Sequence, residues 1–182
     1  MKKLLSSKKY YLAKLLSNNS RYIDDINTIN YKGFNQKAKE IYPAELLLER
    51  NGNNDKDAVY LDVRVTIKDD EIETGIYNKT DYFNFPVVTF TFLESNIPHQ
   101  LGYQVFYGQV LRYSNIFSNR KQFMIHCSKL FNTLKGRGYK YYLLLKSFRK
   151  VFNKNVDILF KFGIKSSKEA GLEMLESHQS IH

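Results

Sequence analysis

The feature that most constrains the fold is a change in hydrophobic period near residue 100. Before this point, apolar and polar residues alternate from Val59 to Ile67, which is the two-residue period of a half-buried strand. After it, apolar residues recur every three or four positions over 100–118, 121–135 and 139–153, which is the period of amphipathic helices. Strands followed by helices predict an α+β fold.

Turn-forming residues divide the first hundred residues into antiparallel hairpins. Asp24-Asp25 interrupts an alternating segment over 21–31, and Asp69-Asp70 separates the strand over 59–67 from a returning strand over 72–77. Gly136 and Gly138 separate the predicted helix over 121–135 from the one over 139–153. The other predicted elements are strands over 44–49 and 156–164, an edge strand or extended crossover over 83–92, and helices over 1–17, 34–42 and 167–177.

The charge distribution predicts an anionic partner. The net charge is +10, and no acidic residue lies between Glu94 and Asp157. A stretch of cations without acids on predicted helices favours RNA or DNA as the partner, whereas the alternative is an ordinary solvated face produced by biased composition. The residues expected to contact phosphates are Arg112, Arg120, Lys121, Arg137, Lys140, Arg149 and Lys150.

Cysteine content and hydropathy bear on the location of the protein. Cys127 is the only cysteine, so no intrachain disulfide is possible. No apolar run approaches the roughly 20 residues that span a bilayer, and residues 1–9 lack the apolar centre of a secretory signal. We therefore expect an intracellular protein without a membrane partner.

Two adjacent carboxylates, Asp24 and Asp25, form the candidate catalytic and metal site, with Tyr22 just before them. Adjacent acids repel each other, so a turn that keeps both favours a divalent cation such as Mg²⁺. Carboxylates of this kind hold the metal ions of two-metal phosphoryl transfer. The alternative is a solvated turn that closes a hairpin. Asp62, on the polar face of its strand, is expected to be exposed or salt-bridged rather than a third ligand.

A collinear series of short stretches resembles one enzyme family. The stretches are Arg21-Tyr22-Ile23-Asp24-Asp25-Ile26, Ile41-Tyr42-Pro43-Ala44-Glu45-Leu46, Tyr60-Leu61-Asp62-Val63, Ile76-Tyr77-Asn78-Lys79, Phe83-Asn84-Phe85-Pro86, Ser95-Asn96-Ile97-Pro98, Gln109-Val110-Leu111-Arg112-Tyr113 and Arg137-Gly138-Tyr139. Over residues 20–155 they resemble the reverse transcriptases of Penelope-like and related retroelements. The whole series is more specific than its four-residue centre at 22–25.

The resemblance implies the C-terminal part of a polymerase palm plus a thumb. Residues 1–98 would be a partial palm with the hairpin at 22–25 and a second β-hairpin, residues 99–155 a basic thumb-like helical bundle that grips the template-primer, and residues 156–182 a C-terminal tail. Asp24 matches the metal-binding acid of the family, Asp25 its neighbour, and Tyr22 the tyrosine beside the primer terminus. The implied cofactor is Mg²⁺, and the implied reaction is RNA-templated DNA synthesis.

One departure from the family changes the expectation for activity. The other essential carboxylate of the family lies on an earlier palm strand, and nothing acidic precedes Asp24 in this sequence. We therefore expect a reverse-transcriptase fragment that is inactive alone, or one half of a polymerase that needs a separate chain supplying the missing palm and fingers. The alternatives are a non-catalytic basic module that binds RNA or DNA through its helices, and a reading frame without function.

The purified chain is expected to add no nucleotides to a template-primer in the presence of Mg²⁺ and deoxynucleotides. Without a third carboxylate, two metal ions are not held in the geometry that an in-line displacement requires. Primer extension on a denaturing gel measures this. Extension that disappears in Asp24→Ala would contradict the expectation.

Overall fold

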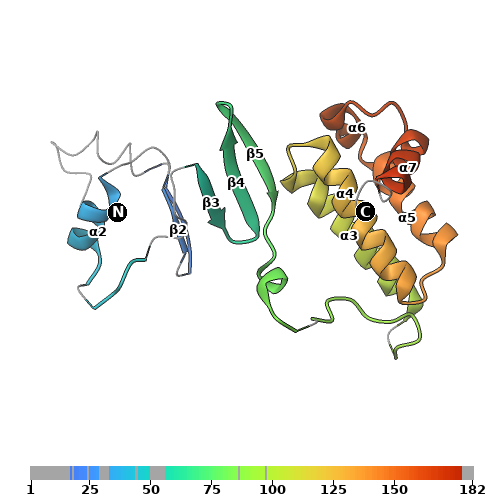
Figure 1. The fold of residues 1–182 in the computed structure, drawn as a ribbon, viewed down its shortest axis with the longest axis horizontal. Helices are drawn as coiled ribbons and strands as arrows, with labels where there is room; N and C mark the ends of the chain where they lie inside the picture. Colours follow the sequence, from blue (N-terminus) through green and yellow to red (C-terminus); the bar gives the residue numbers. More distant parts are fainter. Residues whose placement is uncertain are drawn as a thin grey trace. The chain divides into compact units, whose positions relative to one another are not determined.

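The computed structural model describes residues 17, 19–23, 25–28, 33–43, 45–49, 56–85, 87–96 and 98–177. The chain divides into two compact units, residues 1–61 and 62–182. Figure 1 shows the helices and the strands, which form two small sheets, and just over half of the described residues are helical. This composition confirms the predicted α+β class. None of the helices in the described ranges is long and apolar enough to cross a membrane.

The first unit contains a short hairpin and one helix. Strands β1 (Ser20–Tyr22) and β2 (Asp25–Asn27) pair antiparallel with Tyr22 opposite Asp25, as the predicted hairpin requires. Helix α2 (Phe34–Ile41) ends before Pro43, as predicted, and strand β3 (Asp57–Tyr60) follows later in the chain.

One prediction for the first unit is wrong, and another falls almost entirely outside the described residues. The strand predicted over 44–49 is wrong for its described residues, because 45–49 form no ladder and Leu46, Leu47 and Leu48 stay exposed. The helix predicted over 1–17 falls, except for Ser17, outside the residues that the structure describes.

The second unit begins with the β4–β5 hairpin. Strands β4 (Val63–Lys68) and β5 (Glu71–Ile76) pair antiparallel around Asp69 and Asp70, which both have positive φ angles. Positive φ at both central residues is the geometry of a tight type I′ turn, so the predicted hairpin is confirmed. The single strand predicted over 59–67 is wrong. Leu61 has a φ angle of 57°, and this left-handed residue separates β3 from β4.

Five α-helices follow in the described residues of the second unit. After the short 3₁₀ helix η2 (Lys79–Tyr82), the described residues of 83–96 form no strand, so the edge strand that was one of the two predictions for 83–92 is not seen there. The helices are α3 (His99–Ile116), α4 (Arg120–Gly136), α5 (Tyr141–Lys154), α6 (Val156–Phe162) and α7 (Ser167–Glu176). The first three and α7 confirm predicted helices.

The strand predicted over 156–164 is wrong, because these residues form α6. Ile158 and Phe162 are four positions apart and both are buried, which is the spacing of one helix face. Gly163 ends the helix with a φ angle of 62°.

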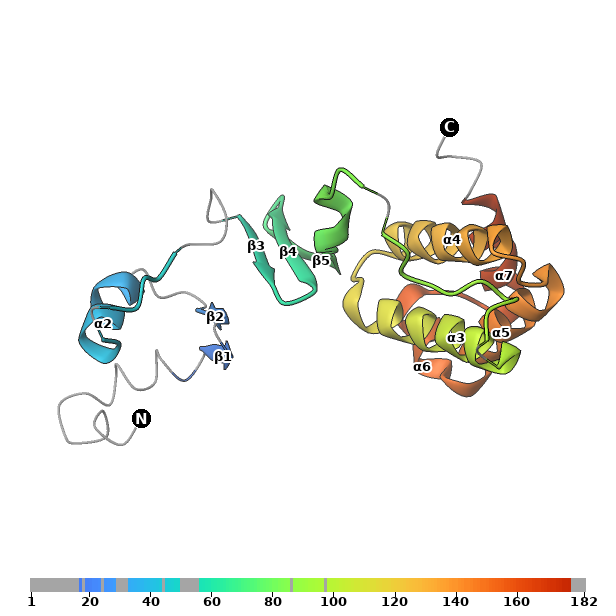
Figure 2. The same ribbon diagram turned by 90° about the horizontal axis from the view of Figure 1, so that it is seen from below.

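The hydrophobic core lies among the helices of the second unit, which Figure 2 shows packed together. Phe106 of α3, Phe131 of α4 and Phe148 of α5 are fully buried. Phe123 of α4 stacks on Phe162 of α6 with ring centroids 4.6 Å apart. Helices α6 and α7 are therefore part of the core.

Phe123→Ala is expected to lower the free energy of unfolding of the helical unit by about 3–5 kcal/mol, because it leaves a cavity beside Phe162. The matched control is Phe160→Ala on α6, since Phe160 is 82% exposed; its effect is expected to stay within about 0.5 kcal/mol. Denaturant unfolding followed by circular dichroism measures both variants. Equal losses in the two variants would contradict the assigned core.

Candidate nucleic-acid interface

The predicted catalytic residues lie at the β1–β2 hairpin of the first unit. Tyr22 is 55% exposed, and Asp25, its cross-strand partner, is half-buried. Directly opposite side chains lie on the same face of a two-stranded ribbon. Asp24 falls outside the described residues. Within the described ranges, no three His, Cys, Asp or Glu side chains lie close enough together to hold a metal ion. The magnesium site therefore stays a prediction.

Arg112, a predicted phosphate contact on α3, forms an ion pair within the fold. Its Nε donates to Asp62 Oδ2 at 3.0 Å, and Nη2 donates to the same oxygen. Nη1 donates to the side chain of Gln109 at 3.3 Å. The pair fastens α3 to the residue just before β4, so this guanidinium has partners within the chain although its side chain is 41% exposed. Asp62 is salt-bridged, as the sequence indicated.

Arg120, at the start of α4, is held by α7 and by the end of α6. Its Nε and Nη2 donate to the Glu173 carboxylate at 2.9 and 2.6 Å, and Nη2 also reaches Glu169 at 3.3 Å. Nη1 donates to the carbonyl oxygens of Phe162 and Gly163 at 3.3 and 3.0 Å. The hydrogen bond from Arg120 to Glu173 is the main cause that raises the pKa of Arg120. Arg120 therefore joins α4 to α7. All three of its guanidinium nitrogens already donate hydrogen bonds within the chain, so none is left for a phosphate.

Arg137 and Arg149 are half-buried. The Arg137 guanidinium lies 5.5 Å from the centre of the Phe92 ring, and its Nη1 is buried without a hydrogen-bond partner in the described part of the chain. The Nε of Arg149 is likewise buried without a partner there. The side chain of Arg149 covers Gly171 of α7, where an added Cβ would lie 3.1 Å from Nε. Both guanidinium groups therefore lie against other parts of the second unit.

The lysines among the predicted contacts are exposed, and one of them belongs to a regular row. Lys121, Lys140 and Lys150 all have exposed side chains. On α5, Lys146, Lys150 and Lys154 follow one another at four-residue intervals and are all exposed. We call these three residues the α5 lysine row. Residues four positions apart share one helix face and lie about 6 Å apart along the axis.

The row faces solvent because the opposite face of α5 is in the core. Leu144, Phe148, Val151 and Phe152 on that face are all buried. Lys146 and Lys154 were not among the predicted contacts, although their spacing from Lys150 is visible in the sequence. The signal that identifies them is the four-residue period, and α5 contains no acidic residue that would neutralise the row.

The N-terminal end of α5 combines exposed tyrosine rings with backbone N–H groups that no side chain caps. Lys140 occupies the N-cap position of α5, but its side chain makes no capping hydrogen bond. The first turn of the helix contains no acidic residue. Tyr141 and Tyr142 are 43% and 61% exposed, whereas Tyr139 is buried edge-on against Tyr103. A helix N-terminus attracts phosphate groups, and exposed rings stack on bases. The lysine row and this end of α5 form the candidate interface.

No family model, curated protein or solved structure matches this chain. The residues of the chain itself therefore carry the functional argument.

Arg120→Gln is expected to lower the free energy of unfolding by about 1–2 kcal/mol at pH 7, because charged hydrogen bonds to partly exposed carboxylates are lost. The pKa of Glu169 lies below its ordinary value of 4.5, first because the Lys165 backbone N–H donates to it and then because Arg120 does. A lowered acid pKa stabilises the fold above the ordinary value, and this contribution is lost as the pH falls through the folded-state pKa. The loss caused by Arg120→Gln should therefore shrink toward pH 3.

Urea unfolding at pH 7 and pH 3 measures this dependence. Lys121→Gln is the matched control, because it removes the same charge from the neighbouring, exposed position of α4. A loss in Arg120→Gln that is the same at both pH values, or no larger than that of the control, would contradict the joining of α4 to α7 by Arg120.

Proposed function

We propose that the chain is part of a reverse transcriptase, palm hairpin plus thumb, and that its helical unit binds an RNA or DNA template-primer. The observation that supports nucleic-acid binding is the α5 lysine row, on the same helix as an N-terminus without a side-chain cap. The assignment to a polymerase rests on the collinear sequence resemblance. The hairpin that brings Tyr22 opposite Asp25 supports it.

The proposed binding uses exposed lysines rather than arginines. Lysine ammonium groups on one helix face contact successive phosphates and release the counterions that surround the nucleic acid. Tyr141 and Tyr142, at the start of the same helix, stack on bases or pack against sugars. Arg120 and Arg149 instead contact α7, and the burial of the inner face of α5 leaves the row exposed.

The catalytic part of the proposal needs more carboxylates than the described residues bring together. Two adjacent acids with Tyr22 nearby suit one divalent ion, but two-metal chemistry requires further oxygen ligands. Asp25 belongs to no group of three potential ligands in the described ranges. The residues that the structure describes do not by themselves make up a two-metal site.

An exposed aromatic segment supports a polypeptide partner that completes the polymerase. Phe83 and Phe85 stack on each other with ring centroids 5.2 Å apart, and both remain exposed. Tyr82, Val88 and Phe92, in the same part of the chain, are exposed as well. Exposed apolar side chains gathered in one segment are typical of interaction surfaces. The proposed partner is a separate chain that supplies the missing palm and fingers.

A second candidate function is a non-catalytic module that binds RNA or DNA through the helices, with Asp24-Asp25 only a turn. The observation in its favour is that the lysine row is complete within the helical unit and uses no residue of the β1–β2 hairpin. Magnesium distinguishes the two candidates. Binding that strengthens with Mg²⁺ and loses this gain in Asp25→Asn supports the polymerase, whereas binding that is indifferent to Mg²⁺ supports the module.

The double substitution Lys146→Gln/Lys150→Gln is expected to weaken binding to a DNA–RNA hybrid. Each lost phosphate contact removes about 0.9 from the slope of log affinity against log salt, so the slope should fall by about 1.8. Fluorescence anisotropy across a NaCl series measures the slope.

The matched control is Lys165→Gln/Lys168→Gln, which removes the same charge from exposed positions outside the row. Equal changes in the two double variants would show that only net charge matters and would contradict the row. No binding of the unmodified chain to any polynucleotide at low salt would refute both candidate functions.

A further inference from the structure

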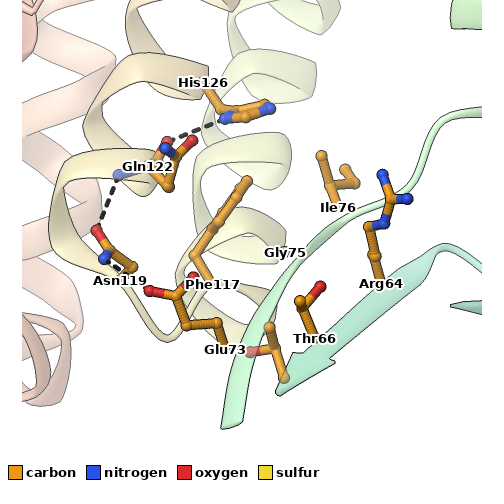
Figure 3. A pocket seen from close by; sticks show the side chains of 10 residues that line it. Arg64, Thr66, Glu73, Gly75, Ile76, Phe117, Asn119, Gln122 and His126 are labelled. Carbon is orange, nitrogen blue, oxygen red and sulfur yellow. Dashed lines mark hydrogen bonds between the residues drawn. The ribbon is translucent and has the colours of Figure 1, made fainter. Parts of the chain in front are cut away.

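A pocket of about 160 Å³ lies in the second unit between the β4–β5 hairpin and the start of α4 (Figure 3). Arg64 comes from β4, Glu73 and Gly75 from β5, Phe117 from the α3–α4 connection, and Gln122 and His126 from α4. Neither the lysine row nor Asp25 contributes a residue to it. Its residues therefore call for a separate explanation.

Hydrogen bonds fix the walls of the pocket relative to each other. The Ser118 N–H donates to the Thr74 carbonyl at 3.1 Å, and the Thr74 N–H donates to Ser118 Oγ at 2.9 Å. The Thr74 hydroxyl also donates to the Ile116 carbonyl at 2.5 Å. These bonds join β5 to the α3–α4 connection, so the pocket is formed before any ligand arrives.

One wall of the pocket is aromatic, with the Phe117 and His126 rings tilted by 41° to each other. The rings of Phe117 and His126 lie 4.6 Å apart, and Tyr113 packs edge-on against both. Gly75 presents bare strand backbone to Phe117, and a Cβ at this position would lie 3.3 Å from the Phe117 ring. A larger residue would therefore crowd the ring. A planar, partly apolar ligand matches such a wall better than a phosphate does.

Hydrogen-bond acceptors line the pocket together with the guanidinium of Arg64, which is a donor only. His126 Nδ1 lies 2.9 Å from the Gln122 carbonyl, so Nδ1 carries the proton and Nε2 is left as an acceptor. Burial lowers the pKa of His126, which keeps the ring neutral at pH 7. The Glu73 carboxylate binds Lys68 and Asn119 and retains capacity for a further donor. The exposed Gln122 amide can pair with either a donor or an acceptor.

We propose that this pocket binds one unpaired nucleobase that carries an exocyclic amino group, namely guanine, adenine or cytosine. An amino group donates two hydrogens, which suits acceptors such as Glu73 and His126 Nε2, whereas thymine and uracil have no amino group. The pocket volume of about 160 Å³ is on the scale of a single planar base. The proposal rests on the proposed function, because the bound polynucleotide supplies the base.

The test compares binding of the full chain to a short oligothymidylate and to oligonucleotides of the same length with one central dG, dA or dC. The ratio of affinities cancels the phosphate contribution common to all strands. The amino-bearing strands are expected to bind about tenfold more tightly. Gln122→Ala and His126→Phe are expected to bring the ratio near unity. His126→Phe keeps a ring against Phe117, and Gln122 is exposed, so both variants should stay folded.

Controls and a second arm separate the possible outcomes. Gln104→Ala and His99→Phe, at exposed positions of α3 outside the pocket, should keep the preference. Equal affinities for all strands, or a preference that persists in both pocket variants, would overturn the pocket inference. The proposed function would still be supported in that case, provided that the chain binds oligothymidylate. Free guanosine and cytidine, titrated by NMR, test the other source of the same base. If they bind at the pocket while no strand binds, the pocket takes free nucleosides and the proposed function fails.

Discussion

Burial of aromatic rings between α3, α4 and α5 is the interaction on which the rest of the helical unit depends. Phe106, Phe131 and Phe148 are fully buried, and burying one such side chain contributes about 1.5–3 kcal/mol. The same packing draws in α6 and α7 through Phe162 and Met174. Once the inner face of α5 is fixed by this core, its outer face has only one orientation. The lysine row is exposed for that reason.

The contrast between arginines and lysines follows from their side-chain chemistry. A guanidinium is a planar fork with five donors, which suits Arg120 for binding Glu173 and two backbone carbonyls at once. An ammonium on a flexible stem is strongly hydrated, so Lys146, Lys150 and Lys154 stay at the surface. In this protein the arginines mainly hold helices and the lysines provide the charge that an anionic partner meets.

The β4–β5 hairpin and the helices form one continuous structure at the α3–α4 connection. Paired hydrogen bonds between Thr74 and Ser118, and the contact of Gly75 with Phe117, make that junction. The described residues before Phe106, by contrast, include Ala38 as their only buried apolar side chain. Ile76, Phe90 and Leu93 pack partly against the core, whereas Phe83 and Phe85 are exposed, and a polypeptide partner is proposed to cover the exposed ones.

The sequence by itself determined which segments become long helices, because the three-to-four-residue period of α3, α4 and α5 is a local property. It also determined the hairpins at 22–25 and 69–70, where turn residues divide alternating segments. Short segments were ambiguous. Residues 156–164 became α6 because burial of Ile158 and Phe162 in the core overrides the local preference of a short apolar run.

Only the tertiary structure decided what the charged residues do. Arg120 meets Glu173 across 53 residues of sequence, and Arg112 meets Asp62 across 50, so neither pairing has a local signal. The same holds for the pocket, whose walls come from segments that lie far apart in the chain. The sequence determines the charge of each side chain. Whether that charge faces solvent or an ion-pair partner within the chain depends on which distant segments pack beside it.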